Sequence, residues 1–371
     1  MFKEYSEKNR ADLPPLTIIQ GCGTIRRDES ERVLQYDKAS LSNYKVVNKG
    51  DFIVHLRSFE GGLEKANSRG IISPAYHTFH GECIDSRFFY AYFRSKKFID
   101  TDLKPHVYGI RDGRSIDIEG MKTIIIPFTS YPEQKLIGDA IDTLNNLITL
   151  HQRKYEKLQS IKKGLLEKMF PADGALTPSI RFKGFTEAWE QRKLSSLGKI
   201  ETGNTPSTSI SDYYSDDGLL WVTPTDIKSN ITLDTERKLS STGVKVARVI
   251  PKNSILCTCI ASIGKNTFLP VKSAFNQQIN ALSSNDDNDP YFLYTNSYHW
   301  SKTMKKSAGG LTFQIVNKTE FSNIETIIPI KTEQIHIGLL FKELDDVITL
   351  HQRKCEKLQN IKKALLQKMF C

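Results

Sequence analysis

The sequence predicts a mixed α/β protein in which one domain-plus-helix unit occurs twice. Residues 147–170 (LITLHQRKYEKLQSIKKGLLEKMF) and 347–370 (VITLHQRKCEKLQNIKKALLQKMF) differ at only five positions. Their separation of 200 residues is far longer than the period of a solenoid repeat. The length of 371 residues also exceeds the size at which a single core stops growing. We therefore expect two related domains, each followed by its own copy of this segment.

The repeated segment has the pattern of a long amphipathic helix. Residues 133–170 contain no proline, and Pro171 follows them. Apolar residues recur at steps of three and four: Ile141, Leu144, Ile148, Tyr155, Leu158, Ile161, Leu165 and Met169. A helix of this length extends roughly 57 Å at 1.5 Å per residue. We expect the two helices to pack against each other in a coiled-coil-like rod.

The segments that precede the helices align with each other only loosely. NYKVVNKGDFIVHLRS (43–58) runs parallel to VARVIPKNSILCTCIA (246–261), and a β-like run ending in proline precedes each helix. The two halves are predicted to share one scaffold with different surfaces, in a pseudo-twofold internal repeat. The predicted order is a first domain (1–130), a helix (131–170), a linker (171–192), a second domain (193–330) and a second helix (331–371).

Composition indicates an anionic partner. Lys and Arg number 52 against 42 Asp and Glu, which gives a net charge of +10. The start of the chain is charged, and no run of eighteen apolar residues occurs, so we expect a cytoplasmic protein. The six cysteines include no CxxC pair, and Cys257 and Cys259 lie in a strand-like run. We expect reduced core thiols and no metal site.

A search for catalytic motifs predicts that the chain is not an enzyme. No GxxxxGK[ST] phosphate loop occurs. Asp289-Pro290-Tyr291 lacks the second proline of the [DNS]PP[YFW] motif that an adenine methyltransferase uses to hold a flipped base. Glu133-Gln134-Lys135 has an ExK form but opens a helix without the other carboxylate of a nuclease site. We expect no catalytic residue and no cofactor.

The order of these segments resembles a type I restriction-modification specificity subunit. A variable domain is followed by a helix ending in LLEKMFP, a linker with RFKGFTEAWEQRKLSSLG, a second variable domain and the helix again. In the second half, GNTPS (203–207), LLWVTPTDI (219–227), IPKNSILCTCIASIGK (250–265) and FNQQINAL (275–282) are similar to the target-recognition-domain pattern. No counterpart of residues 181–194 precedes the first domain, which we expect to be shortened.

The resemblance implies two target-recognition domains separated by two long antiparallel helices. Each domain would read one half of a split, asymmetric target in double-stranded DNA. Such a subunit has no chemistry of its own. It docks modification (methyltransferase) subunits, two of them, and restriction (motor-nuclease) subunits can then join. Candidate partner contacts are the repeated pairs His151 with Arg153 and His351 with Arg353.

Candidate DNA-binding residues are basic or amide side chains in loops after strand-like runs. Lys and Arg suit phosphates, Arg suits guanine, and Asn and Gln suit adenine. In the first domain they are Arg57, Lys65, Arg69, Arg94, Lys97, Arg111 and Arg114. In the second they are Lys265, Asn266, Lys302, Lys305, Lys306 and Gln314. Trp221 and Trp300 could stack on bases, although Trp221 fits a core position better. Each of these basic residues could equally be an ordinary surface charge.

Two other functions are compatible with the sequence. A specificity subunit of a bipartite type II restriction system would show the same features. A non-catalytic adaptor, whose helices dimerise and whose domains bind protein, would explain the helices but not the basic loops. An autonomous DNA-modifying enzyme is the least favoured reading, because its motifs are missing.

Overall fold

The computed structural model describes residues 1–30, 38–109, 114–172, 174–228, 230–260, 262–308 and 315–370. The chain forms two compact units. The first unit combines Met1–Gln152 with Arg353–Cys371, and the second is Arg153–Gln352. Each long helix therefore contributes its N-terminal part to one unit and its C-terminal part to the other. The sequence predicts each helix as one undivided segment, whereas in the structure each helix is shared between the two units.

The first unit contains a four-stranded antiparallel sheet. Its order is β1 (Phe2–Tyr5), β8 (His77–Gly81), β5 (Phe52–Val54) and β6 (Glu64–Lys65). Three strand pairs accompany it: β2 (Leu16–Ile19) with β3 (Gly23–Arg26), β4 (Lys45–Val47) with β7 (Gly70–Ile72), and β9 (Val107–Tyr108) with β10 (Ser115–Ile116). Its short helices are α1 (Ser58–Gly61), α2 (Ser86–Phe93) and α3 (Ile118–Met121).

The second unit contains a sheet of the same form. Its order is β12 (Gly198–Thr202), β20 (Ile279–Ser284), β17 (Ser254–Thr258) and β18 (Asn266–Leu269), all antiparallel. A second sheet has the order β13 (Tyr214–Ser215), β15 (Lys238–Leu239), β14 (Leu219–Val222), β19 (Ser273–Phe275) and β16 (Val249–Ile250). β11 (Glu190–Lys193) pairs with β21 (Glu325–Ile328). The short helices are α5 (Leu194–Leu197), α6 (Ser241–Val246), α7 (Pro290–Ala308) and α8 (Lys318–Ser322).

The two sheets are successive copies of one scaffold. Each strand of the first sheet has its counterpart about 200 residues later, in the same place in the strand order. The first unit has no strand pair equivalent to β11 and β21 among the residues that the structure describes. Residues 123–127, which correspond to β21, form no strand there, and the Ile125 side chain is 94% exposed. The repeat seen in the sequence is therefore a repeat of topology, with one strand pair specific to the second unit.

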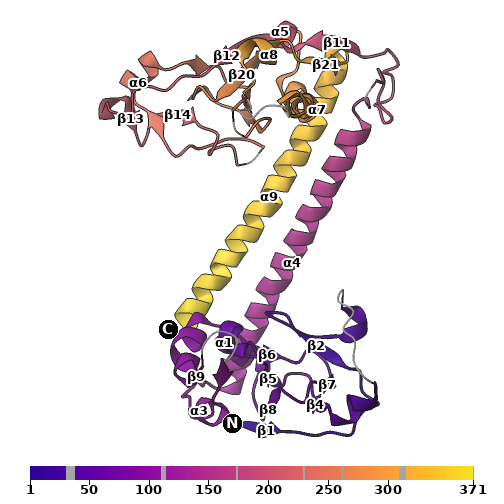
Figure 1. Cartoon of the computed structure of the whole chain (residues 1–371), viewed down its shortest axis with the longest axis vertical. Helices are drawn as coiled ribbons and strands as arrows, with labels where there is room; N and C mark the ends of the chain where they lie inside the picture. Colours follow the sequence, from indigo (N-terminus) through magenta and orange to yellow (C-terminus); the bar gives the residue numbers. More distant parts are fainter. Residues whose placement is uncertain are drawn as a thin grey trace. The chain divides into compact units, whose positions relative to one another are not determined.

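The two long helices lie where the apolar periodicity predicts them. α4 spans Tyr131–Lys168 and α9 spans Lys331–Met369 (Figure 1). In the first unit, Ile137 and Ile141 near the start of α4 pack on the same core as Leu366 and Met369 near the end of α9. Further along, the side-chain amide oxygen Oε1 of Gln152 accepts a hydrogen bond from the Cys355 thiol at 3.6 Å. Within this unit the helices therefore run antiparallel.

Each helix ends in a phenylalanine that enters an aromatic core. Phe170 stacks on Phe292 in the second unit, with ring centroids 5.7 Å apart. Phe370 packs against Phe88 and Tyr92 in the first unit, at 5.4 and 5.5 Å. The repeated sequence KMF thus anchors the end of each helix to a globular core. The apolar stripe itself is incompletely covered, because Ile161 and Leu365 remain about 40% exposed.

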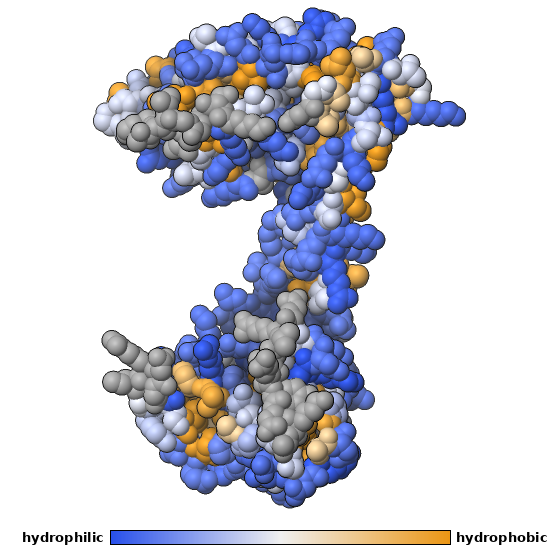
Figure 2. All heavy atoms as spheres, turned by 45° about the vertical axis from the view of Figure 1, so that its right-hand side comes forward, coloured by the Kyte–Doolittle hydropathy of each residue, from blue (hydrophilic) through white to orange (hydrophobic). Residues whose placement is uncertain are grey.

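The surface seen in Figure 2 is largely hydrophilic, and three of the cysteines are buried. Figure 2 shows that hydrophilic side chains dominate this face, with apolar residues in scattered patches. Within the described ranges, no helix is both long and apolar enough to cross a membrane. Cys257, Cys259 and Cys355 are buried free thiols, in line with the predicted core role. Cys22 and Cys83 are exposed, contrary to that prediction, because both lie in turns that follow strands.

Candidate nucleic-acid interface

A basic groove of about 970 Å³ lies in the first unit, between its globular domain and the two long helices. The turn between β2 and β3, α2, α4 and α9 all contribute to its wall. Seven cations line it: Lys65, Arg87, Arg94, Lys96, Lys97, Lys362 and Lys363. Among the described residues that line it, Asp142 is the one acid. The groove is thus a concave, positively charged surface.

Some of the DNA-binding residues predicted for the first domain line the groove, and others lie elsewhere on the surface. Lys65, Arg94 and Lys97 line it, although they come from separate sequence clusters. The others with a described position are exposed and do not line the groove: Arg57, Arg69 and Arg114. The guanidinium of Arg114 lies 5.0 Å from the centre of the Phe59 ring. Arg111 lies outside the described residues.

Arg94 has a structural partner in the fully buried carboxylate of Glu64. Its Nη1 donates to Glu64 Oε1 at 2.5 Å. The same carboxylate accepts hydrogen bonds from the Gly21 and Gly23 amides, at 2.7 and 3.2 Å, and from the Tyr90 hydroxyl at 2.7 Å. These contacts fix the turn between β2 and β3 at the edge of the groove. Arg94 therefore stabilises this edge of the groove. Because Glu64 neutralises its charge, Arg94 attracts an anionic ligand less strongly than the sequence suggests.

Lys65 also has a defined environment. Its Nζ lies 5.4 Å from the centre of the Tyr90 ring, within range of a cation–π interaction. Partial burial lowers the pKa of the Lys65 ammonium below its ordinary value. A lysine held on an aromatic ring at the wall of a groove is preorganised for a negatively charged ligand.

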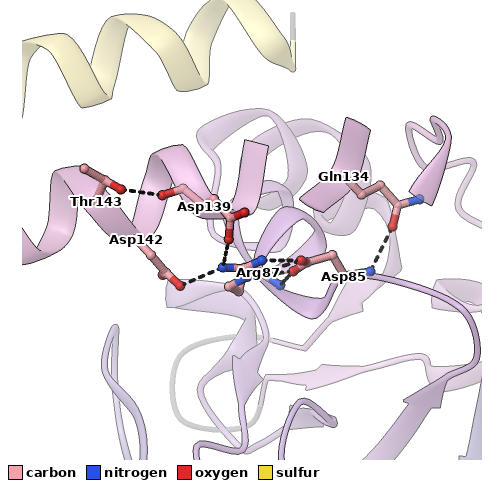
Figure 3. A network of polar contacts seen from close by, with 6 residues as sticks. All are labelled: Asp85, Arg87, Gln134, Asp139, Asp142 and Thr143. Atoms are coloured by element: carbon pink, nitrogen blue, oxygen red, sulfur yellow. Dashed lines mark hydrogen bonds and ion pairs between the residues drawn. The ribbon is translucent and has the colours of Figure 1, made fainter. Parts of the chain in front are cut away.

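Arg87, which the sequence analysis did not select, joins α2 to α4 (Figure 3). Its Nη1 donates to Asp139 at 2.6 Å and to Asp142 at 3.1 Å, both on α4. It also contacts Asp85, whose side chain caps α2 by accepting from the Arg87 amide at 2.9 Å. The sequence Asp85-Ser86-Arg87 indicates the start of a helix. It does not reveal the contact of Arg87 with α4, because Asp139 and Asp142 lie more than fifty residues away in the chain.

A glutamine clamp recurs in both units. Gln134 Oε1 accepts from the Asp85 amide at 3.0 Å, and Gln334 Oε1 accepts from the Asp289 amide at the same distance. Each glutamine also donates to a carbonyl just before its own helix, Thr129 or Pro329. The pair Glu133-Gln134 recurs in the sequence as Glu333-Gln334, and its glutamine holds the start of each long helix to its domain.

The second unit contains a buried ion pair between the two long helices. Lys162 Nζ lies 2.5 Å from Asp345 Oδ1, and the Asp345 side chain is 1% exposed. Asp345 also accepts hydrogen bonds from the Tyr291 hydroxyl and the Asn230 amide, each at 2.9 Å. Three donors thus compensate the buried carboxylate, as such a charge requires.

The predicted residues of the second unit lie around the turn after β17 and on α7. Lys265, Lys302 and Lys305 are exposed, and Lys302 Nζ lies 4.1 Å from the centre of the Tyr298 ring. Gly264 has φ +77°, in the left-handed region, and a Cβ there would lie 2.9 Å from Lys305 Cε. Glycine therefore permits this turn to approach α7. Gln314 and the side chain of Lys306 lie outside the described part of the chain.

Asn266 and the two tryptophans point into the protein. The Asn266 amide nitrogen donates to Ser301 Oγ at 2.7 Å and to the Ser297 carbonyl at 3.2 Å, which holds β18 against α7. This geometry favours a structural role for Asn266. Trp221 and Trp300 are 5% and 1% exposed. Their rings are part of the core, as expected for Trp221, and neither presents a surface on which a base could stack.

The predicted partner contacts lie on the middle of the long helices. His151 and His351 are half-buried, whereas Arg153 and Arg353 are exposed. No group of three or more potential metal ligands occurs within the described residues.

Comparisons with known proteins identify relatives. The family model "Type I restriction modification DNA specificity domain" matches residues 186–360. The HindI specificity subunit of Haemophilus influenzae is 28% identical over 241 residues, which cover 63% of this chain and 50% of that protein. The MjaIX specificity subunit of Methanocaldococcus jannaschii is 28% identical over 189 residues, 49% of this chain and 44% of that protein. The matches thus span about half the length of these relatives.

Solved structures share the fold. The type I restriction-modification S subunit from M. genitalium aligns with a TM-score of 0.66 and 14% identity, over 100% of this chain and 96% of that one. A chain from a study of complex assembly in the type I restriction-modification system aligns with a TM-score of 0.51 and 15% identity, over 100% and 97%. At such low identity, the likeness concerns the fold alone.

Proposed function

Because the chain belongs to the type I restriction-modification specificity subunits, we propose that it is the DNA-binding subunit of such a complex. The observation that carries this proposal is the repeated sheet, in the order β1-β8-β5-β6 and again β12-β20-β17-β18. Two copies of one scaffold with different surface residues suit two half-sites of different sequence. The target is then bipartite and asymmetric, and the excess of basic residues supplies contacts to phosphates.

In this proposal, α4 and α9 pair along their length and separate the two recognition domains. Their lengths of 38 and 39 residues correspond to roughly 57 Å each. The bases between the half-sites are left unread, and the helices set their number. The antiparallel contacts within the first unit support such pairing.

The helices also offer a docking surface for partners. We propose that His151 with Arg153, and His351 with Arg353, contact two modification subunits. The near-identity of the two helix sequences suits two identical partners around a pseudo-twofold axis. Restriction subunits then join this complex. The chain itself contributes no catalytic group, and methylation and cleavage belong to its partners.

The proposal is tested by single-molecule methylome sequencing of a host that expresses the chain with its cognate methyltransferase subunit. The expected result is a split methylation motif that appears only when this chain is present. The control is the same methyltransferase with another specificity subunit, which must produce that subunit's own motif. If the control works and this chain adds no motif, the proposal is wrong.

A further inference from the structure

The pseudo-symmetry of the helices breaks at one buried position. Lys162 and Asp345 form the ion pair of the second unit. A shift of 200 residues takes Lys162 to Lys362 and Asp345 to Asn145. Both of these line the basic groove of the first unit. The lysine is therefore present in both units, whereas the carboxylate that neutralises it is present in only the second.

Lys362 lacks an internal counter-charge. It is half-buried, and within the described residues no carboxylate forms an ion pair with it. Burial lowers the pKa of its ammonium below the ordinary value, since a partly dehydrated charge is disfavoured. A buried lysine without a partner is costly unless an anion from outside compensates it.

The groove around Lys362 has room and charge for such an anion. Its volume of about 970 Å³ is open to ligands, and Lys65, Lys97 and Lys363 also line it. Asp142, the acid at its wall, is bound to Arg87. Asn145 can donate a hydrogen bond to an anionic oxygen where an aspartate would repel it. With Asn145 in place of the aspartate found in the second unit, this part of the groove wall can bind an anion where the second unit has an ion pair.

We propose that Lys362 and Asn145, together with Lys65 and Lys97, bind a phosphate of the DNA backbone beside the half-site that the first unit reads. This inference rests on the proposed function and deepens it. It places a DNA contact on the C-terminal part of α9, a helix otherwise assigned to spacing and docking. In the second unit, Lys162 makes no such contact with DNA, because it already forms an ion pair with Asp345.

Three variants of the full chain test the site. Lys362→Gln removes the charge, and Asn145→Asp supplies the carboxylate that the second unit has. Lys163→Gln removes an exposed charge from α4, one residue after the counterpart of Lys362, and is the control. Binding of each to a 30-base-pair duplex of arbitrary sequence is measured between 50 and 250 mM salt, and melting temperatures are recorded alongside.

The expected result separates loss of the site from loss of the fold. The slope of log K against log salt should fall by about 0.9, one phosphate contact, in both Lys362→Gln and Asn145→Asp. Lys163→Gln should keep the slope of the original chain. Asn145→Asp should also raise the melting temperature, because it completes an ion pair, so weaker DNA binding cannot then be a folding defect.

The two proposals fail in different ways. An original chain that binds no duplex at any salt concentration overturns the proposed function, and this inference with it. An original chain that binds DNA, with an unchanged slope in Lys362→Gln and Asn145→Asp, overturns the site alone. A third outcome also overturns the site: inorganic phosphate stabilises the original chain but not Lys362→Gln, while the salt dependence of DNA binding is the same in both. The anion bound at Lys362 is then not DNA.

Discussion

Equivalent residues in the two units carry different charges, and their neighbours explain why. Tyr291 in the second unit takes the place that Arg87 has in the first, near the start of the helix after each four-stranded sheet. Tyr291 donates to Asp345, whereas Arg87 donates to Asp139 and Asp142. At this position the repeat has diverged together with its contacts, because the change from Arg87 to Tyr291 is accompanied by a different set of carboxylate partners.

Asp345→Asn is expected to destabilise the second unit by about 3–5 kcal/mol, since it leaves Lys162 as an uncompensated buried charge. Asp345 also accepts from Tyr291 and Asn230, and an amide replaces only part of this acceptor capacity. Hydrogen-exchange protection of α7 measures the change. The control is Asp346→Asn, because Asp346 and Lys342 form an exposed ion pair of little energetic value. Equal protection in both variants would contradict the prediction.

Candidate site residues could be selected from the sequence by type but not by environment. Lys65 and Lys97 were found because basic residues follow strand-like runs. The neutralisation of Arg94 by Glu64 could not be seen, because these residues are thirty positions apart and meet only through the sheet. Lys362 is one of several lysines in the repeated helix, and its type alone does not distinguish it from the others. Its distinctive feature is the absence of a carboxylate that its counterpart Lys162 has.

At the scale of elements, the long helices were the most predictable part. Sustained apolar periodicity and Pro171 placed the first helix at 131–170, and α4 spans Tyr131–Lys168. The strands were less accessible, because most have two to five residues and several are buried on both faces, which removes the alternation of polar and apolar residues. The division of each helix between two units depends on long-range packing, which no local pattern encodes.

The contact between α2 and α4 depends on Arg87 and leads to a prediction about pH. Burial raises the pKa of Asp85, but hydrogen bonds from Arg87 outweigh it, and the net pKa is lowered. A lowered pKa in the folded state means that the contact stabilises the unit above the ordinary Asp pKa. The stabilisation is lost as the pH falls through the lowered value.

Arg87→Met should therefore destabilise the first unit at pH 7, by about 2 kcal/mol, because it removes charge-assisted hydrogen bonds. The difference from the original chain should shrink as the pH approaches 3. Hydrogen-exchange protection of residues 86–93 at pH 7 and at pH 3 measures the loss of stability at each pH. Arg10→Met, which removes an exposed contact to Asp12 in the same unit, serves as the control and should have no effect at either pH. A difference that stays constant with pH would contradict the role of Asp85.

At the scale of the whole molecule, the contacts between the two helices inside each unit follow the same residue numbering. Gln152 meets Cys355 in the first unit, and Lys162 meets Asp345 in the second. Each pair of residue numbers adds to 507, so one antiparallel register accounts for the contacts inside both units. An insertion into one helix alone breaks this register, whereas matched insertions between 153 and 154 and between 353 and 354 preserve it.

Insertion of four helix-forming residues at both places should lengthen each helix by about 6 Å. If the helices set the spacing between half-sites, the methylated motif should keep both half-sites and gain one or two unread base pairs, since base pairs are about 3.4 Å apart. Methylome sequencing reads both features in one experiment. The same four residues inserted after Gly184, an exposed turn with φ +98° before β11, should leave the motif unchanged. New half-sites with the old spacing would show that the helices shape recognition and do not measure distance.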